Sequence, residues 1–360
     1  METEKERQCA VSEDIDLTEE EETLMLIPVE SGGNHEPQSY LRRWCSLLSA
    51  SAVAIVVCVL MTSVKVLNSP SPSSFNTALD PETLHNCIHS WNQNTRRYKQ
   101  RLETQRAFRP SEDTGARFRF DFIEPVWDCE VKDRIGHSPF GDGPKFICDA
   151  EFSLNDSNCL VFSIGSNGDR SFEEAILAIN PQCEVHTFDC TLDMRHEYLR
   201  KFVEEAPKIG FQFHDYCLGS PKLRIGNGKT LNLKQAMQFV SRPRPITHFK
   251  IDCEGCEFSS FFNDLDSFNA DDPPFEQLMI EMHTRRRNVS HILNLFDRLD
   301  GLGLRLFSKE RNGWGCSGVR CAEFSFISER SAFRGHVYNQ CPEYLPVWKT
   351  LCSQNKILGC

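Results

Sequence analysis

Two stretches decide the fold of this chain: Asn158-Cys-Leu-Val-Phe-Ser-Ile-Gly-Ser-Asn-Gly-Asp169 and Val185-His-Thr-Phe-Asp189. An apolar run ends at Gly165, Gly168 follows, a helical pattern begins, and a second apolar run ends at Asp189. This order predicts a βαβ unit, in which glycines let the backbone approach a ligand and the helix N-terminus favours that ligand electrostatically. The acid lies 24 positions after Gly165, where the acceptor of ribose hydroxyls falls in a nucleotide site. A plain glycine turn that only caps a helix is the alternative, and we favour the nucleoside-cofactor site.

Strand-like and helical segments alternate beyond this unit, which predicts an α/β fold with a doubly wound, mostly parallel sheet. The expected strands are 158–164, 185–188, 211–214, 246–251, 277–283, 304–307 and 322–327. The last two are candidates for an antiparallel pair joined by the glycine-rich segment 311–318. The expected helices are 80–106, 170–179, 192–206, 231–240, 258–265 and 289–299.

The negative charge of the chain is concentrated at its N-terminus. The formal net charge is −11, and residues 1–39 account for −10 of it through twelve acidic and two basic residues. We therefore predict that residues 1–43 form an acidic, disordered tail. The remaining chain is nearly neutral and has no basic stripe, which argues against a nucleic-acid partner.

Residues 44–64 read WCSLLSASAVAIVVCVLMTSV, 21 residues without a charge, which is long enough to cross a bilayer. Their position after a long acidic stretch favours a transmembrane signal anchor over a cleaved signal peptide, and a buried core helix is the other alternative. Arg42 and Arg43 precede the span and Lys65 follows it. The positive-inside rule then predicts a single-pass type II protein with its catalytic domain in the lumen of the endoplasmic reticulum or Golgi, or at the cell surface.

Features after the span agree with a lumenal body. Fourteen of the 17 cysteines lie there, and an oxidising compartment lets cysteines pair. Asn155 and Asn288 begin glycosylation sequons, and 68–74 is a proline-rich stem segment. The expected organisation is a tail at 1–43, a span at 44–64, a stem and outer helix at 65–119, a cysteine-containing cap at 120–157, a Rossmann-like domain at 158–330 and an extension at 331–360.

The cysteines after the span suggest particular pairs. A Cys129–Cys148 disulfide is our hypothesis for the cap, and Cys316 with Cys321 are candidates for a second bond across the last hairpin. The C-x-x-C at 253–256 would need a thioredoxin-like context or a second cysteine pair to bind zinc or act in redox chemistry. Neither is evident in the sequence, so we expect these two cysteines to be structural.

Polar residues gather where the predicted strands end, and ligands bind open α/β sheets at that edge. These residues are Gly165, Asp189, Asp215, Asp252, Glu254, Glu281 and His283. We predict Asp252 as catalytic base, with His283 and Glu254 as further catalytic candidates. Asp252, Glu281 and His283 are also the candidate ligands of a divalent metal. The alternative is a hydrogen-bonded scaffold in which Asp252 caps the next helix.

The sequence also resembles known families. Val161-Phe-Ser-Ile-Gly-Ser-Asn-Gly168 resembles the first motif of class I S-adenosylmethionine-dependent methyltransferases. His248-Phe-Lys-Ile-Asp-Cys-Glu-Gly-Cys-Glu257 is similar to the K-I-D-x-E-G-x-E signature of the FkbM-type methyltransferases. The lead-in at 127–148 looks like that of the methyltransferase-like protein 24 group, and the resemblance covers about 120–330.

This resemblance implies a Rossmann-like sheet of seven strands with an antiparallel last strand, and S-adenosylmethionine as cofactor. Gly165, Ser166 and Gly168 would then line the methionine and ribose. Asp189 would bind the ribose hydroxyls, and Asp215 would lie near the adenine.

The expected activity is O-methylation of a sugar or another small hydroxyl acceptor in the secretory pathway, with a divalent metal as a second candidate cofactor. A Golgi-type glycosyltransferase is the main alternative, because Asp264-Leu-Asp266 offers a D-x-D for a metal–nucleotide-sugar complex. A catalytically inactive methyltransferase-fold binding protein is the third class. It would fit Ser163 and Ile164, which stand where many class I enzymes carry an acid before the first glycine.

Overall fold

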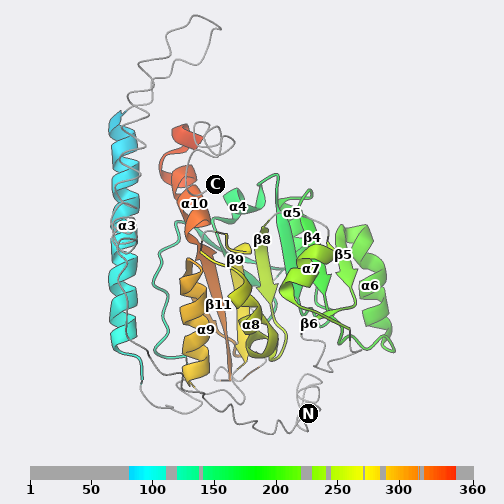
Figure 1. Ribbon diagram of the computed structural model, residues 1–360. Helices are drawn as coiled ribbons and strands as arrows, with labels where there is room; N and C mark the ends of the chain where they lie inside the picture. Colours follow the sequence, from blue (N-terminus) through cyan, green and yellow to red (C-terminus); the bar gives the residue numbers. More distant parts are fainter. Residues whose placement is uncertain are drawn as a thin grey trace, which may run out of the picture. The chain divides into compact units, whose positions relative to one another are not determined.

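The computed structural model describes residues 81–110, 120–137, 141–219, 229–240, 245–270, 272–283, 289–314, 316 and 320–345 (Figure 1). The predicted tail, the predicted span and the sequon at Asn288 lie outside these residues. Among the residues that are described, no helix combines the length and the apolar character needed to cross a membrane.

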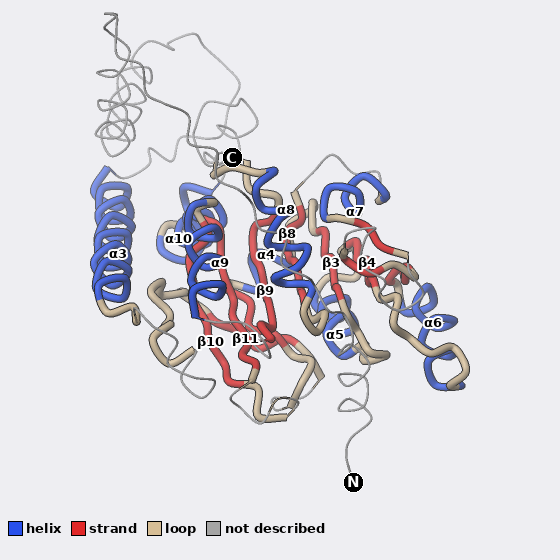
Figure 2. The backbone as a smooth tube through the Cα atoms, turned by 60° about the horizontal axis from the view of Figure 1, so that its bottom comes forward, coloured by secondary structure: helices blue, strands red, loops and turns tan. Residues whose placement is uncertain are grey.

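The centre of the fold is a seven-stranded sheet with the strand order β10-β11-β9-β8-β3-β4-β5 (Figure 2). Its strands are β3 (Leu160–Ile164), β4 (Glu184–Phe188), β5 (Phe211–His214), β8 (Ile246–Ile251), β9 (Phe275–His283), β10 (Leu304–Arg311) and β11 (Cys321–Ser328). The pairs among β5, β4, β3, β8 and β9 are parallel, whereas β11 runs antiparallel to both of its neighbours. The expected seven-stranded, mostly parallel sheet with an antiparallel last strand is confirmed.

The order of the strands places the switch point of the sheet at β3. The chain proceeds from β3 outward to β4 and β5, then returns to the other side of β3 to form β8 and β9. Connections therefore leave in opposite directions from the carboxyl ends of β3 and β8. In open α/β sheets this reversal creates the crevice in which ligands bind.

Helices cover both faces of the sheet. Their bounds are α3 (Pro81–Ala107), α4 (Ala150–Leu154), α5 (Ser171–Ile179), α6 (Glu197–Ile209), α7 (Leu233–Phe239), α8 (Phe262–Asp264), α9 (Val289–Gly301) and α10 (Glu329–Gln340). Alternate residues of β3 point to opposite faces, so Phe162 packs in the core that includes α7 and α9, and Val161 packs in the core that includes α5 and α6. All five residues of β3 are buried, as expected for a central parallel strand.

Two predicted helices differ from the observed ones. The helix expected at 192–206 begins only at Glu197, because Asp189 accepts the backbone N–H of Thr191 (2.9 Å) and Asp193 accepts that of Arg195 (3.0 Å). Such local aspartate bonds compete with helix formation. The helix expected at 258–265 is instead a continuous run of π turns (η2, Glu257–Phe261), α8 and 3₁₀ turns (η3, Leu265–Ser267).

Residues of the predicted cap form an antiparallel pair, β1 (Lys132–Ile135) and β2 (Lys145–Cys148). This pair is attached to the central sheet by the side chain of Gln277 in β9. The Gln277 amide donates to the carbonyl oxygen of Cys148 (2.8 Å) and accepts the N–H of the same residue (2.9 Å). The cap is thus held against β9 of the central sheet, beside β11. A second small pair is parallel and consists of β6 (Cys217–Leu218) and β7 (Thr230–Leu231).

The long helix α3 is anchored to the sheet around Arg305 of β10. The guanidinium of Arg305 lies 5.4 Å from the Trp91 ring, 4.7 Å from the Tyr98 ring and 4.4 Å from the Trp127 ring. It also pairs with Glu329 at 2.7 Å. Cation–π contacts of a desolvated guanidinium are the stronger kind, so Arg305 joins α3, the cap and the sheet.

The twelve cysteines from Cys87 to Cys341 form six disulfides. The pairs are Cys87–Cys341, Cys129–Cys148, Cys159–Cys183, Cys190–Cys217, Cys253–Cys256 and Cys316–Cys321. Both hypothesised pairs are among them. The C-x-x-C is bonded to itself, in agreement with a structural role. The last helical turn, η4 (Pro342–Tyr344), follows the end of α10.

Candidate functional site

The glycine loop after β3 is packed directly against the exit of β8. Gly165 has a φ of +76°, and a Cβ atom there would lie 1.7 Å from the carbonyl oxygen of Asp252. The Lys250 ammonium donates to the carbonyl oxygen of Gly165 at 2.7 Å. Only glycine fits this position, since both the backbone conformation and the available space exclude a side chain. The packing brings the predicted cofactor loop and the predicted base together.

Asp189 shapes the same loop from the exit of β4. Its Oδ2 accepts the backbone N–H groups of Ser166 and Asn167, each at 2.9 Å, and its Oδ1 accepts the hydroxyl of Thr191 at 2.6 Å. Both oxygens of this buried carboxylate are therefore engaged by the chain. The spacing argument predicted contact with ribose and missed this loop-holding role.

The remaining predicted cofactor residues lie along the same edge. Gly168 completes the loop with a φ of +78° and packs against Leu199 of α6. Asp215 follows β5, is partly exposed, and pairs with Lys229 at 2.9 Å. The structure thus places Gly165, Ser166, Gly168 and Asp189 at the neighbouring exits of β3 and β4, and Asp215 one strand further out. The Cys190–Cys217 disulfide links the segments that follow β4 and β5.

The exits of β8 and β9 bring the other predicted residues around His283. Its Nδ1–H donates to Oε1 of the fully buried Glu257 at 2.5 Å. Its Nε2 lies 3.3 Å from Glu254 Oε2 and 3.7 Å from Glu281 Oε1. Asp252, Glu254 and His283 offer ligand atoms that all lie within 4.8 Å of one another. Glu254 reaches this position because its backbone adopts a left-handed conformation with a φ of +54°.

The electrostatics of this cluster decide the protonation of His283. Burial disfavours the imidazolium, but the carboxylates of Glu257, Glu281 and Glu254 outweigh burial and raise the pKa of His283 well above its ordinary value. A protonated imidazole holds no lone pair with which to accept a proton. Asp252 therefore fits the role of base better than His283 does.

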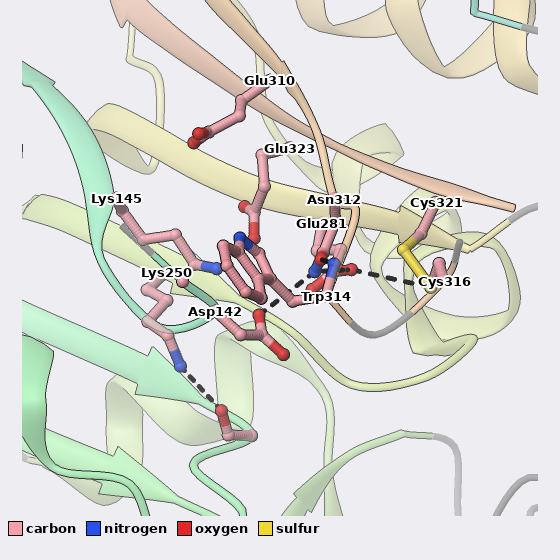
Figure 3. A network of polar contacts seen from close by, with 12 residues as sticks. Asp142, Lys145, Lys250, Glu281, Glu310, Asn312, Trp314, Cys316, Cys321 and Glu323 are labelled. Carbon is pink, nitrogen blue, oxygen red and sulfur yellow. Dashed lines mark hydrogen bonds and ion pairs between the residues drawn. A yellow bond between two sulfur atoms is a disulfide. The ribbon is translucent and has the colours of Figure 1, made fainter. Parts of the chain in front are cut away.

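Glu281 is a buried carboxyl group that lies close to other acidic side chains. Burial raises the pKa of Glu281 well above its ordinary value, and the nearby charge of Asp252 raises it further. The Asn312 amide donates to Glu281 Oε1 at 2.8 Å and to Asp142 Oδ1 at 3.1 Å. Figure 3 shows this network together with Lys145, which pairs with Glu323.

The donor set around His283 suits a divalent metal, which would bind Nε2 in place of its proton. His283 Nε2 is buried and has no hydrogen-bond partner among the described residues, while Glu257 holds Nδ1 in the way that orients metal-binding histidines. Carboxylates of Asp252 and Glu254 add oxygen ligands beside it. Glu281, a member of the predicted metal set with Asp252 and His283, lies within 4.8 Å of His283 in one group of ligand atoms and of Asp142 and Glu323 in another.

Sequence reasoning missed several residues of this edge. Glu257 was visible as the last residue of the K-I-D-x-E-G-x-E match and Lys250 as its first, but the pattern alone did not show what either contacts. Asp142 lies in a Gly-Asp-Gly turn for which the sequence favours a structural role over contact with a ligand. Asn312 and Glu323 carried no signal, since they come from the last hairpin and meet Glu281 only in the folded chain.

The candidate D-x-D and the sequon at Asn155 lie outside the cluster of residues at the strand exits. Asp264 accepts the backbone N–H of Leu233 at 2.9 Å, and Asp266 pairs with Arg298 at 2.6 Å. Both acids serve the packing of neighbouring helices, away from the strand exits. Asn155 is exposed in the turn after α4.

Comparison with known proteins gives one strong match and several weak ones. No curated protein matches the chain. Solved structures include the Methanococcus jannaschii fibrillarin pre-rRNA processing protein, which is 11% identical with a TM-score of 0.33, covering 56% of this chain and 88% of that one. Aeropyrum pernix fibrillarin with natively bound S-adenosyl-L-methionine is 9% identical with a TM-score of 0.32, covering 54% and 88%. Precorrin-6y C5,15-methyltransferase from Geobacter metallireducens is 7% identical with a TM-score of 0.29, covering 50% and 87%.

The family comparison is decisive where these superpositions are weak. A family model described as "Methyltransferase domain" matches residues 84–328. The match includes α3, the cap and the whole seven-stranded sheet, so it covers most of the chain and all of the strand exits described above. This chain therefore belongs to that methyltransferase-domain family and is a methyltransferase.

Proposed function

We propose that the protein uses S-adenosylmethionine to methylate a hydroxyl group of a sugar or another small acceptor. The observation that carries this proposal is the contact between the glycine loop and the exit of β8. The loop that contains Gly165 packs there against the backbone of Asp252, and Lys250 bonds to the carbonyl oxygen of Gly165. The proposed cofactor loop therefore lies beside the carboxylate of Asp252. The resemblance of the surrounding segment to the FkbM-type enzymes and to the methyltransferase-like protein 24 group supports the same reading.

The residues around β3 and β4 fit the cofactor. Gly165, Ser166 and Gly168 form a backbone turn without bulky side chains, suited to the methionine and ribose, and Asp215 lies on the side proposed for the adenine. Asp189 would bind ribose by giving up some of its contacts with the loop. S-adenosylmethionine supplies an electrophilic methyl group on a sulfonium, so transfer forms an O–CH₃ bond as the S–CH₃ bond breaks.

Asp252 is the proposed general base. A hydroxyl acceptor must lose its proton when its oxygen is methylated, and a carboxylate at the exit of β8 accepts that proton. Alignment of the two reacting groups supplies much of the rate, because in-line displacement depends on orientation. Lys250 serves alignment, since its ammonium fixes the loop carbonyl beside Asp252.

A divalent metal is the proposed second cofactor, held by Asp252, Glu254 and His283 with Glu281 close to the histidine. A cation at that place would lower the pKa of an acceptor hydroxyl. Glu257 would keep the His283 ring in the orientation for binding.

We also propose that residues 44–64 anchor the protein as a single-pass type II membrane protein with its catalytic domain in the secretory pathway. Six disulfides support an oxidising compartment, since such bonds are rare in the cytosol. An exposed Asn155 supports glycosylation there. The proposed partners are the bilayer and a small-molecule or glycan acceptor, and no nucleic acid.

Calorimetry with S-adenosylmethionine and with UDP-sugars tests the cofactor. We expect S-adenosylmethionine to bind and UDP-sugars not to bind, and Asp189→Ala to weaken binding about tenfold or more because it releases the loop. Asp252→Asn should abolish transfer to the acceptor while leaving cofactor affinity within about tenfold. Failure of S-adenosylmethionine to bind would leave the inactive binding protein, and binding of a UDP-sugar would favour the glycosyltransferase.

A further inference from the structure

A second acidic cluster lies beside the proposed catalytic cluster and is built from different elements. Glu281 belongs to β9, Glu323 to β11 and Asp142 to the loop that leads into β2. Oxygen atoms of these three carboxylates all lie within 4.8 Å of one another. Figure 3 shows the three side chains converging from the cap and the sheet.

The arrangement is unfavourable without a positive charge. Glu281 and Glu323 are direct cross-strand partners in the antiparallel pair of β9 and β11, and like charges in that position destabilise a sheet. Glu281 is 1% exposed, so water does not screen it. Burying a carboxylate without compensation is costly.

The chain compensates this charge only in part. Lys145 pairs with Glu323 Oε1 and Asn312 donates to Glu281 Oε1. Among the described residues, Glu281 Oε2 and Glu323 Oε2 have no hydrogen-bond partner, although both atoms are buried. The Lys145 ammonium and the His283 imidazole, whose Nε2 lies 3.7 Å from Glu281 Oε1, face three carboxylates, so a cation bound between the carboxylates would neutralise the negative charge that remains.

The donors identify the chemistry of the ion. All three are carboxylate oxygens, and hard divalent cations such as Ca²⁺, Mg²⁺ and Mn²⁺ prefer such ligands. Cysteines 316 and 321 lie nearby but are bonded to each other, so they are not thiolate ligands for a softer metal.

We propose that Asp142, Glu281 and Glu323 bind a hard divalent cation that fastens the cap and the last hairpin to the central sheet. This site adjoins the one proposed at Asp252, Glu254 and His283 through Glu281, which lies 3.7 Å from His283, but it uses none of those three ligands and does not depend on methyl transfer. Its role is structural, because each ligand comes from a different part of the fold and one ion joins all three.

The position of Trp314 provides a direct assay. Its backbone N–H donates to Asn312 Oδ1 at 2.9 Å, and Asn312 contacts two of the proposed ligands. In Figure 3 the indole ring projects toward Lys145 and Asp142. An indole that lies near a bound Tb³⁺ ion can transfer excitation energy to it. Tb³⁺ takes the place of Ca²⁺ at oxygen sites.

The experiment titrates the purified protein with Tb³⁺, excites tryptophan and follows the lanthanide emission, with Ca²⁺, Mg²⁺ and Mn²⁺ as competitors. We expect sensitised emission that Ca²⁺ displaces, and a rise in melting temperature on adding Ca²⁺. Asp142→Asn and Glu323→Gln should each weaken binding about tenfold or more, because each removes one ligand charge. Trp314→Phe should reduce emission while leaving the Ca²⁺-induced rise in melting temperature unchanged.

Asp252→Asn is the matched control, since it alters the neighbouring cluster and none of the three ligands. Loss of binding in Asp252→Asn with full binding in Asp142→Asn would overturn the proposal in favour of the other cluster. Absence of a melting shift with each of the three cations at about 5 mM would overturn it outright, since a site this weak would gain little free energy. Asp142 lies in the loop before β2 and is only partly buried, so its variant gives a decision even if Glu323→Gln does not fold.

Discussion

At the scale of the residue, Gly165 carries more of the site than its lack of a side chain suggests. It joins the loop of β3 to the exit of β8, and its carbonyl oxygen accepts the Lys250 ammonium. The same residue therefore determines both the shape of the cofactor loop and its distance from Asp252.

Replacement of Gly165 by alanine tests this directly. We expect Gly165→Ala to lower the free energy of unfolding by about 2–3 kcal/mol and to weaken cofactor binding, because the new methyl group meets the Asp252 carbonyl and the positive φ strains a residue with a Cβ. Urea unfolding and calorimetry measure the two effects.

Gly301→Ala is the control for that variant. Gly301 ends α9, and a Cβ atom there would meet nothing within 4 Å. We expect it to be neutral or to stabilise by about 0.5–1 kcal/mol. Equal destabilisation by both substitutions would show that the contact with Asp252 is unimportant.

The residues that the sequence predicted and those it missed differ in a physical way. Asp252, Glu254 and His283 were found because each follows a strongly apolar strand, and strand ends can be read from local composition. Glu323 and Asn312 join the same edge through pairing of β11 with β9 and a loop contact. Nothing in the local sequence records which strand will lie beside which.

At the scale of the element, the edge formed by β4 and β5 contains a pair of histidines. His186 Nδ1 and His214 Nε2 lie 2.9 Å apart, and His214 also packs against the rings of Phe188 and Phe239. Burial, with a smaller contribution from the charge of His186, lowers the pKa of His214 to about 4.

This shift predicts a loss of stability in acid. Between pH 6.5 and about 4 the unfolded chain binds a proton at His214 that the folded chain excludes. Stability is therefore full above the unfolded pKa and falls as the pH decreases through this window. We expect His214→Gln to flatten the dependence of the urea midpoint on pH, compared with the exposed His137→Gln. An unchanged slope in His214→Gln would contradict the assignment.

The docking of α3 is a second property of elements. Arg305→Ala removes the cation that contacts three aromatic rings, and we expect it to lower the free energy of unfolding by about 2–4 kcal/mol. Arg195→Ala is a suitable comparison, since the Arg195 side chain is largely exposed and its loss should leave stability nearly unchanged. Chemical denaturation of both variants gives the difference.

Elements with one clear pattern were predictable and mixed ones were not. The strands at 211–214 and 246–251 have the predicted bounds. A short apolar run between polar turns is too short for a helix and therefore predicts a strand. The segment after Asp252 forms π, α and 3₁₀ turns in succession, and the helical period of 3.6 residues does not distinguish among them. The late start of α6 depends on aspartate–backbone bonds that compete with the helix.

At the scale of the whole molecule, the Cys87–Cys341 disulfide joins α3 to the end of α10 across 254 residues. Closure of a long loop restricts the unfolded chain more than closure of a short one. We expect the double variant Cys87→Ser/Cys341→Ser to lose about 2–5 kcal/mol of stability, measured by thermal or urea unfolding. Cys253→Ser/Cys256→Ser, which opens a separation of three residues, should lose less, and the reverse order would contradict the loop-length argument.

The attachment of α3 also has a consequence for folding during synthesis on the ribosome. Helix α3 is synthesised first among the described elements, whereas its partners Arg305 and Cys341 belong to the last part of the described chain to be synthesised. At about 5–20 residues per second, the 254 residues between the two cysteines take on the order of 10 to 50 seconds to appear. For most of that interval Arg305 is not yet synthesised, so Trp91 and Trp127 stay without its guanidinium. We therefore expect α3 to dock late in folding and its tryptophans to remain accessible to chaperones until the last hairpin has formed.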